Sequence, residues 1–327
     1  MSLAEARTER LAPQPLPDNI RSTQPGGGLI MRLELAWGRL RRARLRAFRP
    51  GYVRRMRDLR RGHCPDCPHD ILDSRDLKFY RNVCGYSFDP ADDPFAGRDR
   101  LPLARAGLAE LLILSLVMCA LTAAAVGWFG MGHTWFWLAA AVSAIVVGWG
   151  VYFFRDPPRR VPEGAGLVVA PADGVVVEVE ELERLEGFEG RVLKIGIFLS
   201  VFNVHINRSP VAARVIQLRY FPGRFLNAMR PRSAAQNEQL WLDLQEESPP
   251  HRRLLVKQIA GAIARRIVCE ARPAELLQRG RRFGMIKFGS RTELCLPIES
   301  GLHISTHVGQ RVRAGVSIVA RYGGDQP

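Results

Sequence analysis

The chain has 327 residues, with 47 Lys and Arg against 32 Asp and Glu and a formal net charge of +15. Hydrophobic residues make up 47% of it, which excludes a wholly disordered or collagen-like chain. Six cysteines are too few for a disulfide framework and indicate a reducing compartment. The length suffices for about two average domains, but the apolar residues are unevenly spread, so the segments differ in kind.

Residues 1–30 are rich in Pro, Gly, Gln and Thr, and this composition predicts a disordered N-terminus. Twelve arginines then lie between Arg32 and Arg61. Leucines, Trp37 and Phe48 are interleaved with them, which favours an amphipathic segment on anionic lipid. Nucleic-acid binding is the alternative for this stretch, and we expect no nucleic-acid partner.

Three cysteines crowd into the following stretch. Cys64 and Cys67 form one Cys-x-x-Cys knuckle, and Cys84 begins a second that has Ser87 in its last position. A zinc ribbon needs four good ligands, and serine is a poor one, so a neighbouring histidine would have to complete the site. Residues 31–100 are therefore interpreted as an Arg-rich segment with a degenerate zinc-ribbon-like module. Zinc bound at the three cysteines is the less favoured alternative.

Residues 111–154 contain no Asp, Glu, Lys or Arg. Two apolar runs, 111–129 and 134–154, each have the roughly 20 residues that a helix needs to cross a bilayer. Tryptophans stand near the ends of the runs, and basic residues flank them but are absent from the turn between, which places both ends in the cytoplasm. Residues 101–155 are predicted to form a transmembrane helical hairpin. A buried helix pair in a soluble core is the alternative.

From residue 156 to residue 327 the pattern changes to short β-segments separated by glycine and proline. Strands are expected at 168–179 around an Ala-Asp-Gly turn, 192–199, 211–220, 256–269, 284–288, 293–296, 303–306 and 308–320. The polar stretch 221–250 is expected to be looser, and 273–280 to be a short helix or turn. The pattern predicts a mainly β, barrel- or sandwich-like α+β catalytic domain.

The segments APADGVVVEV and VGQRVRAGVSIV are also similar to the two halves of biotinyl and lipoyl carrier domains. A carrier needs an exposed lysine at a hairpin tip. The nearest candidate, Lys287, lies inside an alternating strand, so this alternative is disfavoured.

Three motifs follow the hairpin in a fixed order: FLSVFNVHINRSP at 198–210, QIAGAIARRIV at 258–268 and GMIKFGS at 284–290. Together with the hairpin and the Pro-Ala-Asp-Gly turn at 171–174, they resemble the phosphatidylserine decarboxylase proenzymes, specifically the short prokaryotic branch. The similarity runs from about Leu101 to Tyr322 and leaves residues 1–100 outside.

The resemblance implies a self-processing, pyruvoyl-dependent carboxy-lyase of phospholipid biosynthesis. It implies that Ser290 attacks the Gly289 carbonyl and becomes a covalent pyruvoyl group, leaving chains 1–289 and 290–327. The pyruvoyl group would hold phosphatidylserine as a Schiff base and release phosphatidylethanolamine. Because a serine hydroxyl needs a base, the resemblance assigns His205 as that base and Asp173 as the residue that orients it.

The implied substrate is phosphatidylserine in the membrane, which agrees with the hairpin. The catalytic domain is therefore expected on the cytoplasmic side of the cell membrane. Arg208 and Asn207 are candidates for binding the lipid headgroup. Long-type family members have another histidine where this chain has Phe202, so the proton donor to the decarboxylated carbon is unassigned. Arg291 follows Ser290 where the long-type motif has Ser or Thr.

Overall fold

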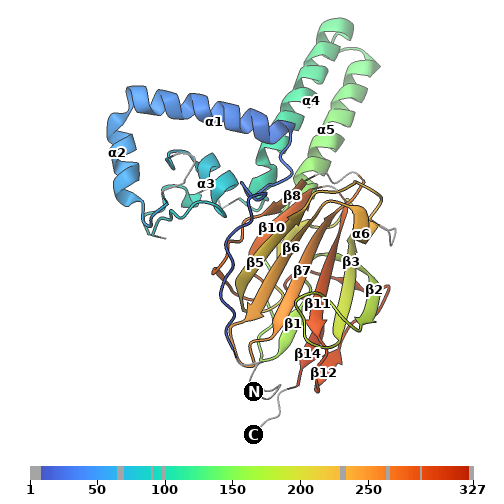
Figure 1. Cartoon of the computed structure of the whole chain (residues 1–327). Helices are drawn as coiled ribbons and strands as arrows, with labels where there is room; N and C mark the ends of the chain where they lie inside the picture. The colour runs from blue at the N-terminus through green and yellow to red at the C-terminus, as the bar shows by residue number, and fades with distance from the viewer. Residues whose placement is uncertain are drawn as a thin grey trace.

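The computed structural model describes residues 9–64, 70–89, 91–97, 101–228, 233–262, 266–287 and 289–323. The helices are α1 (Leu29–Phe48), α2 (Pro50–Leu59), α3 (Ser74–Tyr80), α4 (Leu108–Phe129), α5 (Thr134–Phe153) and α6 (Ser233–Gln236), with a 3-10 turn η2 (Arg105–Gly107). The strands are β1 (Leu167–Val169), β2 (Gly174–Leu182), β3 (Val192–Leu199), β4 (Ile206–Arg208), β5 (Ala213–Phe221), β6 (Gln239–Glu246), β7 (Arg253–Ala260), β8 (Arg266–Cys269), β9 (Leu276–Leu277), β10 (Arg282–Lys287), β11 (Ser290–Pro297), β12 (Leu302–Ile304), β13 (Arg311–Val312) and β14 (Ile318–Tyr322). Helices α1, α2, α4 and α5 lie outside the β-rich part of the molecule, whereas the short α6 lies on it (Figure 1).

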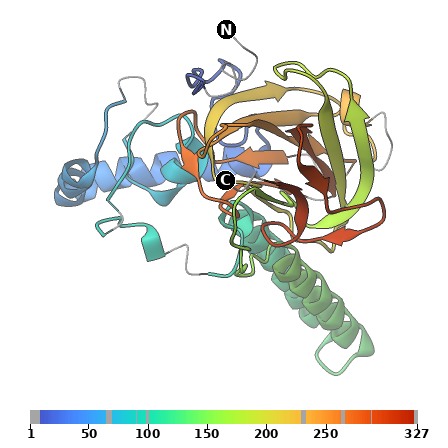
Figure 2. The ribbon, with the colours of Figure 1, turned by 90° about the horizontal axis from the view of Figure 1, so that it is seen from below.

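The largest sheet is antiparallel and has the order β13-β2-β3-β11-β7-β6-β5-β9. It curls into a half-barrel, which Figure 2 shows nearly end-on. Two smaller sheets, β1-β14-β12 and β4-β10-β8, accompany it. The inward positions of the central strands are fully buried aliphatic residues, for example Ile195, Leu242 and Leu294, so burial of one face drives the curl. The expectation of a mainly β domain is confirmed at this level.

Strand β6 corrects the expectation that residues 221–250 are loose. It lies in the middle of the large sheet, between β5 and β7. The sequence of this strand did not indicate its central position, because it includes Asp243, a charged residue that is buried in the structure. Arg219 and Arg253 satisfy that carboxylate, with N–O distances of 3.2 and 3.0 Å. A buried charge that is paired in this way is compatible with a central strand.

The expected disorder of the N-terminus is not seen in residues 9–28, which follow the outside of the half-barrel. The Leu11 amide donates to the Gln245 side chain at 2.9 Å, the Gln14 amide to the Ile216 carbonyl at 2.8 Å, and the Cys269 amide to the Thr23 carbonyl at 2.7 Å. Ile20 is buried in the main core. Contacts of long sequence separation order a segment whose composition alone predicts disorder; residues 1–8 lie outside the described part.

The region from residue 31 to residue 100 is helical rather than ribbon-like. Helix α3 lies between the first knuckle and Cys84, and Asp73 begins it with a capping box that also uses Asp76. Cys64 is disulfide-bonded, Cys84 is a buried thiol outside any disulfide, and Cys67 lies outside the described residues. Among the residues that the structure describes, no group of three or more His, Cys, Asp or Glu side chains could hold a metal ion.

Helices α4 and α5 form an antiparallel pair that projects from one end of the half-barrel (Figure 1). Both are long and apolar enough to cross a membrane. Their base is anchored in the domain, because Phe153 and Phe154 are buried against residues of β4, β8 and β10. At the start of α4, Glu110 forms an ion pair with buried Lys287 of β10. The helix pair is therefore joined to the strand that leads to Ser290.

Candidate functional site

Gly289 and Ser290 lie at the point where the chain turns from β10 into β11. Gly289 has φ +66°, a left-handed conformation that glycine adopts without the steric cost of a Cβ. Ser290 is the first residue of β11 and pairs with Leu199 on one side and Ala260 on the other. Its side chain is fully buried, and its Oγ has no hydrogen-bond partner in the described part of the chain. A buried hydroxyl without a partner is costly in a purely structural role and is expected at a reactive centre.

His205 lies directly beside this turn and is completely buried. The backbone N–H of Gly289 donates to its Nε2 at 3.1 Å, and its Nδ1 lies 2.9 Å from the carbonyl oxygen of Asn203. These partners fix a neutral imidazole with the proton on Nδ1 and the lone pair on Nε2. The ring also packs on Phe153 at the end of α5, with 4.5 Å between ring centroids.

The surroundings of His205 favour the neutral ring. Burial lowers the pKa of His205 to about 4; the Asn203 carbonyl opposes this shift and the positive charge of Arg155 adds to it. The imidazole is therefore unprotonated at neutral pH. Its Nε2 can accept a proton from a nearby donor, which is what a general base requires.

Gly261 approaches the carbonyl of Gly289 from the end of β7. A Cβ at Gly261 would overlap the Gly289 carbonyl oxygen and lie 3.3 Å from the Cβ of Ala228. The preceding residue, Ala260, is held by Asn237, whose Nδ2 donates to the Ala260 carbonyl at 2.6 Å. Sequence reasoning missed this glycine, although it stands in the matched QIAG block. Nothing in a single sequence says that residue 261 touches residue 289.

Asp173 does not contact His205. Its Oδ2 accepts from Arg159 at 2.7 Å, and its Oδ1 accepts from the Ala314 backbone N–H at 2.7 Å. In the described residues, the Nδ1 proton of His205 goes to a backbone carbonyl instead. The expected Ser-His-Asp arrangement is therefore not formed as a hydrogen-bonded chain in this structure. Asp173 binds the loop before β1 to the turn after β13.

The two candidate headgroup ligands are occupied by the protein itself. Arg208 donates to Asp156 at 2.8 Å and to the Gly280 carbonyl at 3.0 Å, and it is buried. Asn207 donates to the Thr292 hydroxyl at 3.1 Å and accepts from Gln258 at 2.9 Å. These contacts give no support to a headgroup role for either side chain. They brace β4, the strand that follows His205.

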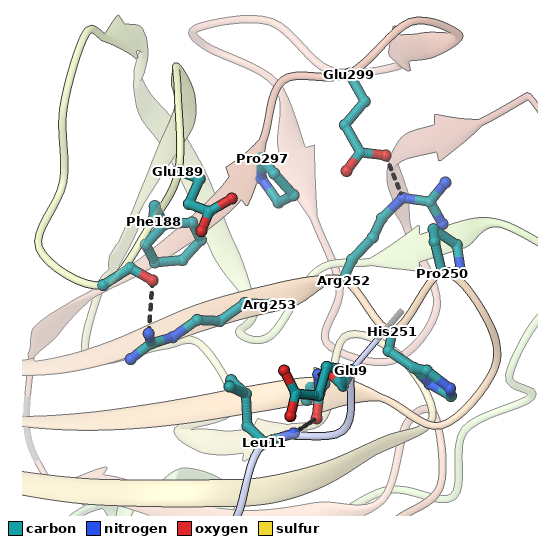
Figure 3. A pocket seen from close by; sticks show the side chains of 12 residues that line it. Glu9, Leu11, Phe188, Glu189, Pro250, His251, Arg252, Arg253, Pro297 and Glu299 are labelled. Carbon is teal, nitrogen blue, oxygen red and sulfur yellow. Dashed lines mark hydrogen bonds and ion pairs between the residues drawn. The ribbon is translucent and has the colours of Figure 1, made fainter. Parts of the chain in front are cut away.

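Neither Lys287 nor the cavity in Figure 3 is a second functional site. Lys287 is only 4% exposed and paired with Glu110, so it cannot be the exposed lysine of a carrier domain. The cavity, of about 180 Å³, contains the Arg252–Glu299 ion pair and lies at the start of β7, whereas Ala260 at the other end of β7 pairs with Ser290 (Figure 3).

Comparisons with known proteins agree with this geometry. A family model described as phosphatidylserine decarboxylase matches residues 148–320. The chain is similar to the phosphatidylserine decarboxylase proenzyme of Rhodopirellula baltica, with 46% identity over 246 residues, 75% of this chain and 99% of the relative. The chain belongs to the phosphatidylserine decarboxylase family. Proenzymes of that name from Desulfotalea psychrophila and Magnetococcus marinus are 42% and 39% identical, over 55% and 59% of this chain and 82% and 87% of the relatives.

The candidate site lies within the residues that the phosphatidylserine decarboxylase family model matches. The family model covers β1 to β14 almost completely, and with them Gly289, Ser290, His205 and Gly261. Helices α1, α2 and α3 and most of the apolar helix pair lie outside the matched residues. The family model therefore covers the strand-rich part of the chain, and the 246 residues shared with the Rhodopirellula baltica relative extend beyond it.

Proposed function

We propose that this chain is a phosphatidylserine decarboxylase proenzyme that cuts itself between Gly289 and Ser290 and then converts phosphatidylserine to phosphatidylethanolamine. One observation carries the proposal beyond family membership. A left-handed glycine, a buried serine hydroxyl without a partner, and a neutral histidine bound to the adjacent peptide meet at one turn. An unpaired nucleophile beside a base is what self-cleavage requires.

The proposed cleavage reaction uses only the chain's own atoms and one water molecule. Ser290 Oγ bonds to the carbonyl carbon of Gly289 while the bond from that carbon to the Ser290 nitrogen breaks, which leaves an ester and a free amine. Removal of the Ser290 Cα proton then expels Gly289 as a carboxylate and leaves a dehydroalanine. Its hydrolysis releases ammonia and leaves a pyruvoyl group on residue 290.

His205 is the proposed base for the first step. The hydrogen bond from the Gly289 N–H holds Nε2 one peptide unit from the scissile bond. The same lone pair can take the Ser290 proton when the nitrogen exchanges partners. The Asn203 carbonyl would orient the ring and stabilise the imidazolium that forms. Asp173, bound to Arg159, is proposed to act on the site only through the loops that it joins.

The residues around the turn would also serve decarboxylation. The pyruvoyl ketone supplies an electron sink for the loss of CO₂ from an amino-acid headgroup. The chain contributes a buried wall made of β3, β7 and β11 around Ser290. Phe153 places this wall at the base of the apolar helix pair, and exposed Phe202 lies nearby, with its carbonyl bound by Arg155 at 2.9 Å.

We further propose that α4 and α5 cross the cell membrane and that the catalytic domain lies on its cytoplasmic side. Both helices join the domain at the same end, so one side of the bilayer must hold both connections (Figure 1). Basic residues at those connections and their absence from the turn favour the cytoplasm. Protease added to right-side-out vesicles should spare the domain; digestion there, but not in inverted vesicles, would reverse the topology.

Intact-mass measurement of the purified chain tests the proposed function together with an assay of phosphatidylserine vesicles. Two fragments, 1–289 and 290–327, and production of phosphatidylethanolamine are expected. A single intact chain that still produces phosphatidylethanolamine would refute the pyruvoyl mechanism. A cut chain that leaves phosphatidylserine unchanged would refute the substrate.

Gly261→Ala should slow self-cleavage strongly while the domain still folds. The added Cβ would push the Gly289 carbonyl away from its position, and the carbonyl carbon must be reached by Ser290 Oγ. Gly85→Ala is the control, since its Cβ would lie 2.5 Å from the His63 carbonyl oxygen, in the N-terminal region and away from Ser290. Cleavage is followed by gel after cell-free synthesis into nanodiscs, and thermal unfolding is compared in a Ser290→Ala background. Cleavage of the Gly261 variant at the control's rate would contradict this role.

A further inference from the structure

Helix α1 presents two different faces, and α3 covers one of them. Glu34 of α1 pairs with Lys78 of α3 at 2.6 Å, and Arg42 of α1 pairs with Asp76 at 2.6 Å. Both pairs are largely buried. Leu45 adds an apolar contact to the small core under the helix. These contacts fix the rotation of α1 about its own axis, so its other face has a fixed direction.

The opposite face of α1 carries a row of large apolar side chains that nothing in the described structure covers. The first four members follow at intervals of three or four residues and the fifth comes eight residues after the fourth, which keeps all five on one stripe of a helix. Each is between 54% and 78% exposed: Leu29, Leu33, Trp37, Leu40 and Phe48. Single exposed apolar residues are ordinary, but an aligned row of five marks an interaction surface.

Guanidinium groups border this row. A groove of about 750 Å³ is lined by Trp37, Leu40 and Phe48 together with Arg41, Arg44 and Arg49. A face that combines large apolar side chains with arginines, of which Arg44 stands within the row, matches the boundary between acyl chains and phosphate headgroups. Arginine stems can lie along the apolar zone while their charged ends reach phosphates.

The position of α1 in the molecule agrees with a membrane surface. In Figure 1, the N-terminal end of α1 lies at the lower part of α4 and the helix extends sideways from there, while α3 lies on the side away from the projecting ends of α4 and α5. The face of α1 that turns away from α3 therefore points to the side on which the helix pair projects. If α4 and α5 cross a bilayer, the apolar row of α1 lies against the surface of the leaflet that surrounds them.

We propose that the exposed face of α1 is an in-plane membrane contact that binds anionic phospholipid. This inference rests on the proposed membrane crossing of α4 and α5. Anionic lipid is chosen over neutral lipid because the border is arginine-rich. The α1 helix lies outside the residues matched by the family model, so it would be an addition to the catalytic domain that gathers anionic headgroups, including phosphatidylserine, beside the site.

Site-specific alkylation tests the contact without using enzymatic activity. Leu40→Cys and the control Ile304→Cys, in β12 and 44% exposed, are made in the full chain and placed in nanodiscs. A charged maleimide is added, and the labelled peptides are quantified by mass spectrometry. Leu40→Cys should react several-fold more slowly in phosphatidylglycerol discs than in phosphatidylcholine discs, while Ile304→Cys should react equally in both.

The result of the labelling experiment shows whether lipid, water or a second copy of the chain lies against the exposed face of α1. Equal, fast labelling of Leu40→Cys in both lipids would show that the face is exposed to water and would overturn the proposal. Equal protection in both lipids, with two chains in each disc, would assign the face to a second copy and also overturn it. Because labelling needs no turnover, a chain that cannot decarboxylate can still pass or fail this test.

A kinetic test follows for active protein. Replacing Leu33, Trp37 and Leu40 together by glutamine should raise the phosphatidylserine fraction needed for half-maximal rate and leave kcat unchanged. Ile304→Gln is the matched control, an exposed apolar side chain on β12. An unchanged half-maximal fraction in the triple variant would contradict the role of the face in gathering substrate.

Discussion

Ser290→Ala should leave the chain uncut and abolish formation of phosphatidylethanolamine completely. The hydroxyl is the proposed nucleophile and also the source of the pyruvoyl group, so no partial activity can remain. Ser290→Cys should still cut, because a thiol can make the same acyl shift. Intact mass spectrometry after synthesis into nanodiscs measures the cut, and lipid chromatography measures the product.

The control for this prediction is Ser209→Ala. Ser209 is equally buried, and its hydroxyl donates to the Val211 carbonyl at 2.7 Å, so its loss costs a hydrogen bond but no chemistry. It is expected to cost about 1 kcal/mol of stability and to leave self-cleavage intact. A Ser290→Ala chain that still breaks after residue 289 would show that another group attacks.

His205→Ala should slow self-cleavage by roughly 10²- to 10⁴-fold, the usual effect of removing a general base. In the described residues, no other titratable side chain forms a hydrogen bond to Gly289. His205→Gln separates two roles, because a glutamine oxygen can accept the Gly289 N–H but cannot take up a proton at neutral pH. Recovery of wild-type cleavage by His205→Gln would reduce His205 to a positioning residue.

The control histidine is His251, whose Nδ1 also lies 3.0 Å from a backbone carbonyl, that of Glu246, but at the other end of the sheet. His251→Ala should cut at the wild-type rate. Equal slowing in both histidine variants would point to a loss of folding rather than of a base.

The low pKa of His205 gives the expected pH dependence. The unprotonated ring is the base, and burial lowers its pKa from 6.5 to about 4. The rate of cleavage should therefore be flat as pH falls through 6.5 and should decline only as pH approaches 4. The same shift means that the unfolded chain binds more protons between these values, so stability falls as pH drops through that range. A cleavage midpoint near pH 6.5 would contradict a buried base.

The sequence predicted those parts of the molecule that local pattern or a contiguous motif encodes. The uncharged run predicted the apolar helix pair, alternation predicted most strands, and the GMIKFGS motif led to Gly289 and Ser290 as the candidate cleavage site. The pairing of β4 with β10 joins residues 74 to 79 positions apart, and the meeting of His205 with Gly289 joins residues 84 positions apart. No periodicity encodes those contacts, and only the resemblance put His205 and Ser290 in one site.

The expectations that changed share a physical cause. The sequence did not predict strand β6, because a buried aspartate, Asp243, is unexpected in a central strand unless it is paired. The sequence did not predict an ordered segment at residues 9–28, because that order comes from contacts with the surface of the half-barrel. Asp173 matched a motif, yet Arg159 and the Ala314 amide take its oxygens. The zinc-ribbon-like module was expected from the spacing of the cysteines alone. The capping box at Asp73 instead favours a helix between the first Cys-x-x-Cys knuckle and Cys84. In each case the partner of a polar group decided the structure.

Reductive trapping of the 290–327 fragment tests the central claim most directly. The purified chain is mixed with phosphatidylserine and cyanoborohydride, and the fragment masses are measured. The account predicts that, without substrate, the 290–327 fragment is lighter by one ammonia than the same residues beginning with serine. With substrate and reductant, that fragment alone should gain the mass of a lipid-derived amine less one oxygen atom, because Schiff-base formation releases water and the reductant adds two hydrogens. A 290–327 fragment with an ordinary serine amine, or a lipid adduct on 1–289 alone, would contradict it.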